Sequence, residues 1–262
     1  MLNTKRGNVL LLVVLVFLLF AINYSFLDKT LEKFLIDYEI TNVERVIDGD
    51  TIVTINETIR LLGINSPERG ELYYEEAKEL LENLILNETV RLKFGKTKYD
   101  RYQRVLAYIY FENKNVNLEI VKQGLANFYF PSGKDIYYKD FKKAWEECVK
   151  DNVNLCEASV DKCATCIKLK EFNYADEIIT LYNQCNFDCD LTSWNIKDEG
   201  RKNFVFPDFI LNSNNPVEII VGEGINSNDE LFWTGEEYVW TRSGDTLFLR
   251  DENGGLVLWE GY

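Results

Sequence analysis

The sequence predicts two folded domains behind an apolar N-terminal segment: first an α+β domain with a small barrel and flanking helices, then an all-β sandwich. Three observations predict this order. Strand-like and helix-like patterns alternate through residues 38–158. Residues 164–262 hold short β-like runs separated by turn signals, without helical periodicity. A continuous apolar run near the N-terminus is long enough to cross a membrane.

The apolar run extends from Val9 to Leu27, which is nineteen residues. Lys5 and Arg6 precede it and Asp28 follows it, so the positive-inside rule places the N-terminus in the cytoplasm. We therefore expect residues 1–28 to form one transmembrane helix that anchors both domains outside the cell. The alternative is a signal segment whose cleavage would make the protein secreted.

Within residues 38–158, alternating apolar residues predict strands, and apolar residues three or four apart predict amphipathic helices. The expected strands are 43–46, 51–55, 58–64, 90–94 and 105–111, and the expected helices are 74–86, 117–123 and 139–148. In the sandwich, the expected strands are 178–182, 204–206, 217–221, 246–250 and 256–259.

Charge is distributed unevenly along the 262 residues, whose net charge is −14. Residues 159–262 carry 8 basic and 19 acidic residues, so most of the acidic excess lies in the last third. A basic cluster lies in the α+β domain, where it could face phosphate groups. Its members are Arg91, Lys93, Lys96, Lys98, Arg101 and Arg104. The ordinary alternative is a solvated strand and loop.

The chain contains no histidine. This absence excludes Ser-His-Asp, Cys-His and histidine-zinc mechanisms, so carboxylates, Lys, Arg, Tyr or Cys must carry any acid-base chemistry. Any metal site must use oxygen or sulfur ligands.

Charged residues lie at the edges of β elements in three stretches, 47–51, 59–68 and 99–110. The oxygens of Asp50 and Asn65 could hold a hard cation such as calcium. Arg60 and Arg104 could clamp a phosphate bidentately, and Glu68 could orient or deprotonate water. Each residue alone has an ordinary structural explanation, and only the combination predicts phosphodiester hydrolysis.

These three stretches stand in the order found in staphylococcal nuclease, and residues 43–154 resemble that family. The helix and turn expected at 116–126 resemble the family's as well. The resemblance implies a five-stranded OB barrel with three helices. It also implies a role for each matching residue. Arg60, Glu68 and Arg104 are catalytic; Asp50, Asn65 and Ser66 hold Ca²⁺, with Asp48 behind them; Arg101, Tyr102, Tyr129 and Phe130 contact the nucleotide.

The chain departs from the family pattern at the metal site. Asn65 stands where the family has a second carboxylate, so one negative charge is lost and we expect weaker calcium binding. Gln103 replaces the glycine that usually precedes the second arginine, and the loop after Glu68 is shorter than in the secreted bacterial enzyme.

The stretch 167–262 resembles the lamin-tail domain, an immunoglobulin-like sandwich. The residues that carry this resemblance are in 177–183, 190–198, 204–207 and 240–257. The signal is spread over turn and core residues, so it implies a fold and not a chemistry. With a net charge of −11, this domain is expected to bind a protein or an envelope component and not DNA.

All six cysteines lie between residues 148 and 189: Cys148, Cys156, Cys163, Cys166, Cys185 and Cys189. An even number in an exported chain favours three disulfides, which would brace the junction between the domains, although the spacing leaves their connectivity open. The alternative is a zinc site formed by Cys163, Cys166, Cys185 and Cys189.

The sequence therefore predicts a calcium-dependent nuclease that hydrolyses single-stranded DNA at the cell surface, with RNA as a second substrate. One alternative is an inactive OB-fold module that binds nucleic acid or protein, with the lamin-tail-like domain as an adaptor. A purely structural surface protein is the other, and the set of Arg60, Glu68 and Arg104 argues against it.

Overall fold

The structure is a computed structural model that describes residues 38–262. Residues Ile40–Tyr262 form one compact unit. The predicted transmembrane helix at 1–28 lies outside the described residues. Within residues 38–262, no helix is long and apolar enough to span a bilayer.

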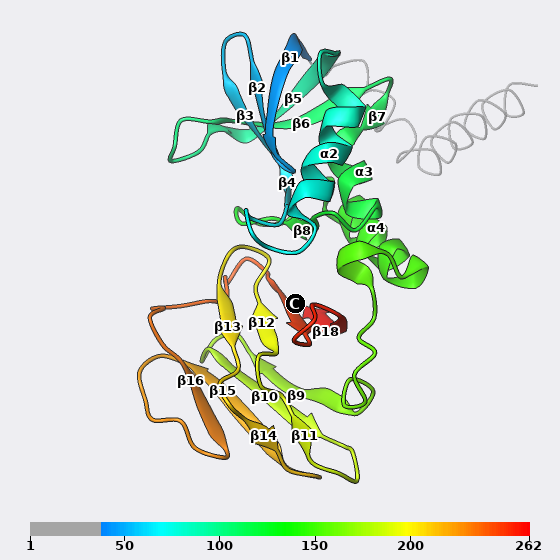
Figure 1. Ribbon diagram of the computed structural model, residues 1–262. Coiled ribbons are helices and arrows are strands. Elements are labelled where there is room, and N and C mark those ends of the chain that lie inside the picture. The colour runs from blue at the N-terminus through cyan, green and yellow to red at the C-terminus, as the bar shows by residue number, and fades with distance from the viewer. Residues whose placement is uncertain (1–37) are drawn as a thin grey trace, which may run out of the picture. The chain divides into compact units, whose positions relative to one another are not determined.

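Five strands close into a barrel in the first half of the described chain (Figure 1). They are β1 (Glu39–Asp48), β2 (Thr51–Thr54), β3 (Thr58–Leu61), β5 (Thr89–Tyr99) and β6 (Val105–Phe111). Their order is β3-β2-β1-β5-β6, and a parallel pairing of β3 with β6 completes the ring. The closed five-stranded barrel confirms the expected OB architecture, and closure leaves none of these strands as a free edge.

Three helices accompany the barrel, as expected: α2 (Tyr74–Ile85), α3 (Val116–Lys122) and α4 (Tyr138–Asp151). The buried residues of α2 recur at helical spacing and form its core-facing stripe. They are Tyr74, Ala77, Leu81 and Ile85. The side chain of Asn115 caps α3 by accepting a hydrogen bond from the backbone N–H of Leu118. We call residues 39–156 the barrel part.

The expected strand 58–64 is divided into β3 and the short β4, and three other short elements were absent from the sequence prediction, because two or three residues carry no periodicity. The short elements are β4 (Gly63–Asn65), β7 (Lys114–Asn115), β8 (Asn127–Tyr129) and the 3₁₀ turn η1 (Asn154–Cys156). β4 and β8 pair antiparallel, which places Asn65 opposite Asn127. This pairing matters for the candidate site.

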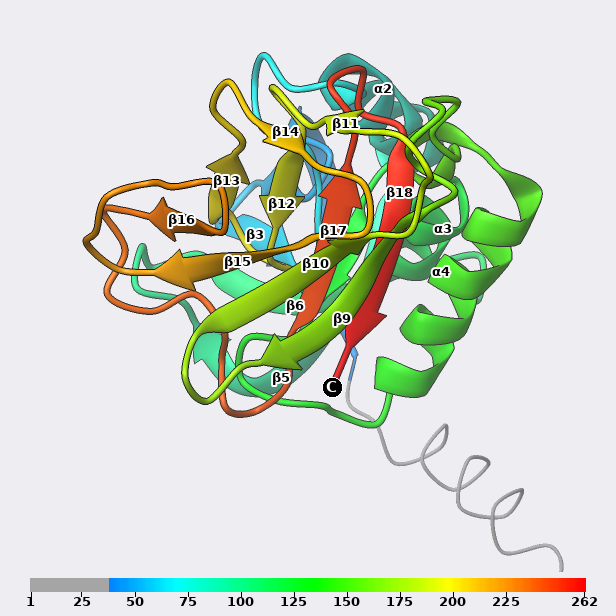
Figure 2. The same cartoon turned by 90° about the horizontal axis from the view of Figure 1, so that it is seen from below.

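Residues 163–262, which we call the sandwich part, are all-β, as predicted. One sheet has the order β16-β15-β10-β9 and the other has the order β13-β12-β17-β18, and a small pair, β11-β14, lies beside them (Figure 2). Apolar side chains from both larger sheets bury into one cluster, as in a two-layer sandwich. The strands are β9 (Ile167–Asn173), β10 (Ile178–Asn183), β11 (Cys189–Asp190), β12 (Asn195–Lys197), β13 (Asn203–Val205), β14 (Ile210–Leu211), β15 (Pro216–Val221), β16 (Glu230–Trp233), β17 (Thr246–Arg250) and β18 (Leu256–Gly261).

The barrel part and the sandwich part share an apolar contact. Phe248 of β17 and Leu256 of β18 belong to the barrel's own buried cluster. The ring of Phe248 lies 5.1 Å from that of Trp145 on α4 and 6.2 Å from that of Phe128 on β8, both in edge-to-face geometry. Burying one such aromatic side chain contributes about 2–3 kcal/mol, so separating the two parts would expose costly apolar surface.

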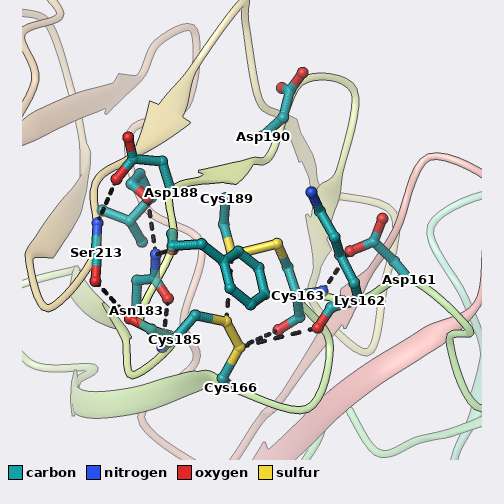
Figure 3. The surroundings of a disulfide bond; sticks show 12 residues. Asp161, Lys162, Cys163, Cys166, Asn183, Cys185, Asp188, Cys189, Asp190 and Ser213 are labelled. Atoms are coloured by element: carbon teal, nitrogen blue, oxygen red, sulfur yellow. Dashed lines mark hydrogen bonds between the residues drawn. A yellow bond between two sulfur atoms is a disulfide. The ribbon is translucent and has the colours of Figure 1, made fainter.

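The six cysteines form three disulfides, Cys148–Cys156, Cys163–Cys189 and Cys166–Cys185. The first joins the end of α4 to η1 within the barrel part, and the other two lie side by side at the start of the sandwich part (Figure 3). The expected disulfides are therefore present. The expectation that they brace the junction is wrong, since none of the three links the barrel part to the sandwich part.

We expect alkylation of the unreduced, denatured protein to modify no cysteine, and reduction to expose all six. Intact mass spectrometry measures this directly. The paired substitution Cys163→Ser with Cys189→Ser opens the loop with the largest sequence separation, 26 residues, and should lower the free energy of unfolding by about 3 kcal/mol. Complete alkylation without reductant would show that these cysteines are thiols or metal ligands.

Candidate active site

The turn between β1 and β2 brings two carboxylates together. Asp50 N–H donates to the Asp48 carboxylate at 3.1 Å, which fixes the turn. Gly49 is required there, because a Cβ would lie 2.6 Å from the Cβ of Ala77 and 2.8 Å from that of Ser66. The turn can therefore pack against α2 and the segment after β4 only with glycine at this position.

Asp50 and Arg60 form a buried ion pair at 2.9 Å, with side-chain exposures of 6% and 8% respectively. The register of β2 and β3 sets Thr51 opposite Arg60, and Leu61 N–H donates to the Asp50 carbonyl at 2.8 Å. The Asp50 carboxylate also accepts from Ser66 N–H at 2.9 Å and from the Thr51 hydroxyl at 3.0 Å. A buried ion pair is tolerated only when additional hydrogen bonds of this kind satisfy its remaining polar atoms.

Both terminal nitrogens of the Arg60 guanidinium also donate hydrogen bonds to groups close by along the chain. Its Nη1 donates to the carbonyls of Leu61 at 2.7 Å and Ile64 at 2.9 Å. Its Nη2 donates to Asn65 Oδ1 at 3.1 Å. Arg60, Asp50, Asn65 and Ser66 thus form one hydrogen-bonded group at the end of the barrel.

Asp48 extends this group. Burial raises the pKa of Asp48 above its ordinary value, and the nearby negative charge of Asp50 raises it further. Two carboxylates so close together create a region of negative potential where a cation would be favoured.

Glu68 lies in the irregular segment between β4 and α2. Its N–H donates to a carboxylate oxygen of Glu71 at 2.8 Å. Its carboxylate pairs with Arg201 of the sandwich part at 2.5 Å and keeps 48% of its side-chain surface exposed. It is therefore open to solvent beside the buried group.

Arg104 ends the loop between β5 and β6. Its Nε donates to the Asp100 carboxylate at 2.7 Å, and Tyr102 lies under the guanidinium groups of both Arg101 and Arg104. Leu106 pairs with Arg60 across β6 and β3, and Arg104 lies in the turn just before β6. Residue Gln103 has a φ of 63°, a left-handed conformation that explains why a glycine suits this position.

The two aromatic residues predicted to contact a nucleotide, Tyr129 and Phe130, lie at the end of β8 and just after it. Tyr129 ends β8, and burial raises the pKa of its hydroxyl, as does the negative charge of Asp198. Phe130 is 7% exposed and packs edge-to-face with Tyr138 and Phe141. The prediction that Phe130 contacts a nucleotide is therefore wrong, because its ring belongs to the core.

The turn between β12 and β13 of the sandwich part also contacts this site. Asn65 Nδ2 donates to the Gly200 carbonyl at 2.7 Å, and Asn127 Nδ2 donates to the Glu199 carbonyl at 2.9 Å. Lys197 pairs with Glu71 at 2.6 Å. Sequence reasoning missed these contacts, because a charged turn between two three-residue strands carries no signal for a site far away along the chain.

A cavity of about 230 Å³ adjoins the same contacts. Asn65, Ser66 and Asn127 of the barrel part line it together with Lys197 and Arg250 of the sandwich part. Burial lowers the pKa of Arg250 to about 10, so the residue stays charged at neutral pH.

The fold and these residues define a class: a small OB barrel that carries a buried acid-arginine pair, with a further arginine and a carboxylate on neighbouring loops. Comparison with known families agrees with this class. Residues 58–157 match the model described as staphylococcal nuclease homologue, and residues 163–262 match that of the lamin tail domain. The chain belongs to the staphylococcal nuclease family, with a lamin tail domain following the nuclease-type barrel.

Similar curated proteins carry nuclease names. The thermonuclease of Staphylococcus intermedius is 32% identical over 125 residues, which are 44% of this chain and 74% of that protein. An uncharacterized endonuclease of Haemophilus influenzae is 37% identical over 102 residues, or 37% of this chain and 56% of that protein. Endonuclease YncB of Bacillus subtilis is 31% identical over 131 residues, covering 45% and 61%. The chain thus spans little more than half the length of the Haemophilus protein.

Three buried carboxyls lie in and beside the β12–β13 turn: Asp198, Glu199 and Asp245. Burial raises the pKa of Asp198 to about 7 and that of Glu199 to about 8. Glu199 accepts hydrogen bonds from the Thr246 hydroxyl at 2.7 Å and from Phe130 N–H at 3.1 Å. These groups are protonated in the folded protein at pH values where they ionise in the unfolded chain.

We therefore expect Glu199 to contribute fully to the free energy of unfolding below about pH 4.5, the ordinary pKa of Glu. This contribution should be lost as the pH rises through its folded-state pKa of about 8. The loss attributable to Glu199 is on the order of 5 kcal/mol. Urea unfolding of wild type and Glu199→Gln between pH 5 and 9 measures it, because glutamine keeps an acceptor and cannot ionise. Identical slopes in the two proteins would contradict this account.

Proposed function

We propose that this protein is a calcium-dependent nuclease that hydrolyses phosphodiester bonds in single-stranded DNA, with RNA as a second substrate. The observation that carries the proposal is the buried Asp50–Arg60 pair at the barrel end, hydrogen-bonded to Asn65 and Ser66, with Glu68 in the segment after β4 and Arg104 immediately before β6. The nuclease names of the family relatives support the same reading.

Each of these residues has a role that fits its place. Arg104 is partly exposed, and within residues 38–262 its ion-pair partner is Asp100, so a phosphate oxygen can replace that carboxylate as its hydrogen-bond acceptor. Arg60 is already oriented by its carbonyl partners and adds positive charge beside the phosphate. Glu68 is solvent-exposed and can accept a proton from an attacking water.

Calcium fits the donor set, which consists of oxygens. Asp50, Asn65 and the carbonyl of Ser66 would hold the ion, and Asp48 adds a second carboxylate close behind. When bound, the ion would supply positive charge that offsets the negative charge of the phosphate oxygens. Asn65 contributes no charge, so the site is weaker than one built on two direct carboxylates.

We also propose that the protein acts at the outer cell surface, held in the membrane by residues 1–28. Three disulfides support an oxidising compartment. If the N-terminal segment were cleaved, the enzyme would be secreted. In either case, we expect the lamin tail domain to bind a protein or an envelope component.

One observation favours the alternative of a binding module without catalysis. Both polar atoms of the Asn65 amide are already used within the protein, Oδ1 by Arg60 and Nδ2 by Gly200. A site so engaged could bind nucleic acid through Arg101, Tyr102 and Arg104 without hydrolysing it.

We expect the full chain to cleave single-stranded DNA in calcium and not in EDTA. Glu68→Ala and Arg104→Ala should each lower kcat by about 100-fold or more. The first removes the group that accepts a proton from water, and the second removes a hydrogen-bond donor to the phosphate. Gel assays with end-labelled oligonucleotides measure the rates. Lys143→Ala, an exposed helix substitution, serves as the control and should leave them unchanged.

Tight binding of the oligonucleotide by folded wild type, without cleavage at any calcium concentration, would support the binding module and refute the enzyme.

Asn65→Asp restores a carboxylate at the metal site, and we expect half-maximal activation at about tenfold lower calcium. The substitution also removes the donor to Gly200, so apo stability should fall by about 1 kcal/mol. Asn127→Asp is a matched control, since it breaks the neighbouring bond to Glu199 without touching a predicted ligand. Equal calcium activation in wild type and Asn65→Asp would show that residue 65 does not bind the ion.

A further inference from the structure

The segment that carries Glu68, residues 66–73, has no regular secondary structure. Its internal bonds are two, Glu68 N–H to the Glu71 carboxylate at 2.8 Å and Glu71 N–H to the Glu68 carbonyl at 2.9 Å. A general base must be held within a fraction of an ångström of its working position. The barrel part holds the ends of the segment, through Ser66 N–H to Asp50 at 2.9 Å and Tyr74 N–H to the Glu71 carbonyl at 3.3 Å. Among the described residues, the ion pair of the Glu68 carboxylate is made by the sandwich part.

The sandwich part contacts this stretch at three residues, one just before the segment and two within it. The Gly200 carbonyl accepts from Asn65 Nδ2 at 2.7 Å, immediately before the segment. Arg201 pairs with the Glu68 carboxylate itself at 2.5 Å. Lys197 pairs with Glu71 Oε1 at 2.6 Å, while Glu71 Oε2 accepts from Glu68 N–H.

All three contacts come from the end of β12 and the turn that follows it. Lys197 ends β12, which pairs with β13 on one side and with the central strand β17 on the other. Phe248 of β17 is inserted into the barrel's core beside Trp145. Buried apolar surface therefore joins the strand next to this turn to the barrel, which favours a defined position of the turn relative to Glu68.

We infer that the lamin tail domain is part of the catalytic apparatus, with Arg201 and Lys197 acting as positioning residues for Glu68. The inference rests on the proposed nuclease function. Both ion pairs are partly exposed, and such pairs are individually weak. Arg201 can therefore orient the carboxylate and still release it to a water molecule, whereas a buried pair would trap it.

These contacts also explain the asparagine at position 65. An aspartate would set a carboxylate oxygen against the Gly200 carbonyl at the 2.7 Å now spanned by a hydrogen bond. Asparagine keeps an oxygen toward Arg60 and presents a donor to the turn. The side chain that lacks the negative charge at the metal site is thus the one that can donate a hydrogen bond to the lamin tail domain.

The test compares Arg201→Ala, Arg201→Lys and Lys197→Ala in the full chain with wild type. We expect Arg201→Ala to lower kcat by roughly tenfold and Lys197→Ala by roughly threefold, with little change in KM, because substrate-binding groups are untouched. Arg201→Lys should recover part of the rate. The melting temperature should stay unchanged in the Arg201 variants, because that side chain is 60% exposed.

Arg242→Ala is the matched control, since Arg242 is an exposed arginine of the same domain that makes no ion pair among the described residues. It should behave as wild type. A kcat for Arg201→Ala equal to or above that of wild type would overturn the inference, and an increase would mean that the turn inhibits the site.

Hydrogen exchange of residues 66–73 provides a readout that does not depend on cleavage. Exchange should accelerate in Arg201→Ala and Lys197→Ala and remain unchanged in Arg242→Ala. If wild type fails to cleave DNA, the nuclease proposal falls, while faster exchange would still establish the anchoring. Unchanged exchange in both variants would refute the anchoring whatever the activity.

Discussion

The buried ion pair between Asp50 and Arg60 is the constraint on which the rest of the site depends. Two charges removed from water are tolerated only if the protein satisfies their remaining hydrogen bonds. The barrel does this with backbone groups: carbonyls of Leu61 and Ile64 receive the guanidinium, and Ser66 N–H reaches the carboxylate. The pair therefore requires the β2–β3 register, the glycine turn at residue 49 and the path of the chain after β4, all at once.

The second constraint is the apolar contact that joins the barrel part to the sandwich part. Phe248 and Leu256 enter the barrel's buried cluster, so residues 40–262 behave as one compact unit although two family models match them. Because this apolar contact holds the two parts together, hydrogen bonds between the candidate site and the β12–β13 turn can form with defined partners. Asn65 and Asn127, paired across β4 and β8, both donate to the β12–β13 turn as a consequence.

Elements with strong periodicity could be predicted, and those without it could not. The stripe of Ala77, Leu81 and Ile85 predicted α2 to within a residue, and the alternating run at 105–111 predicted β6 with its observed bounds. Most of the two- and three-residue strands were missed, because backbone pairing with distant partners and not local preference makes them strands; β4 and β13 were covered in part by the expected strands 58–64 and 204–206. The longer β9 and β16 were missed as well. Phe130 was misassigned for a related reason: a ring that stacks on a base and a ring that packs in a core look alike in sequence.

The sequence by itself determined the barrel, the sandwich and the identity of the acid, arginine and cysteine sets, because these follow from side-chain periodicity and from motifs whose residues are close together along the chain. The tertiary structure alone decided which cysteines pair, which aromatic residue is buried, and that a turn more than a hundred residues away contacts Asn65 and Glu68. Those outcomes depend on long-range packing in the two buried clusters, and burial of apolar surface is non-directional, so no local sequence pattern identifies which distant residues come together.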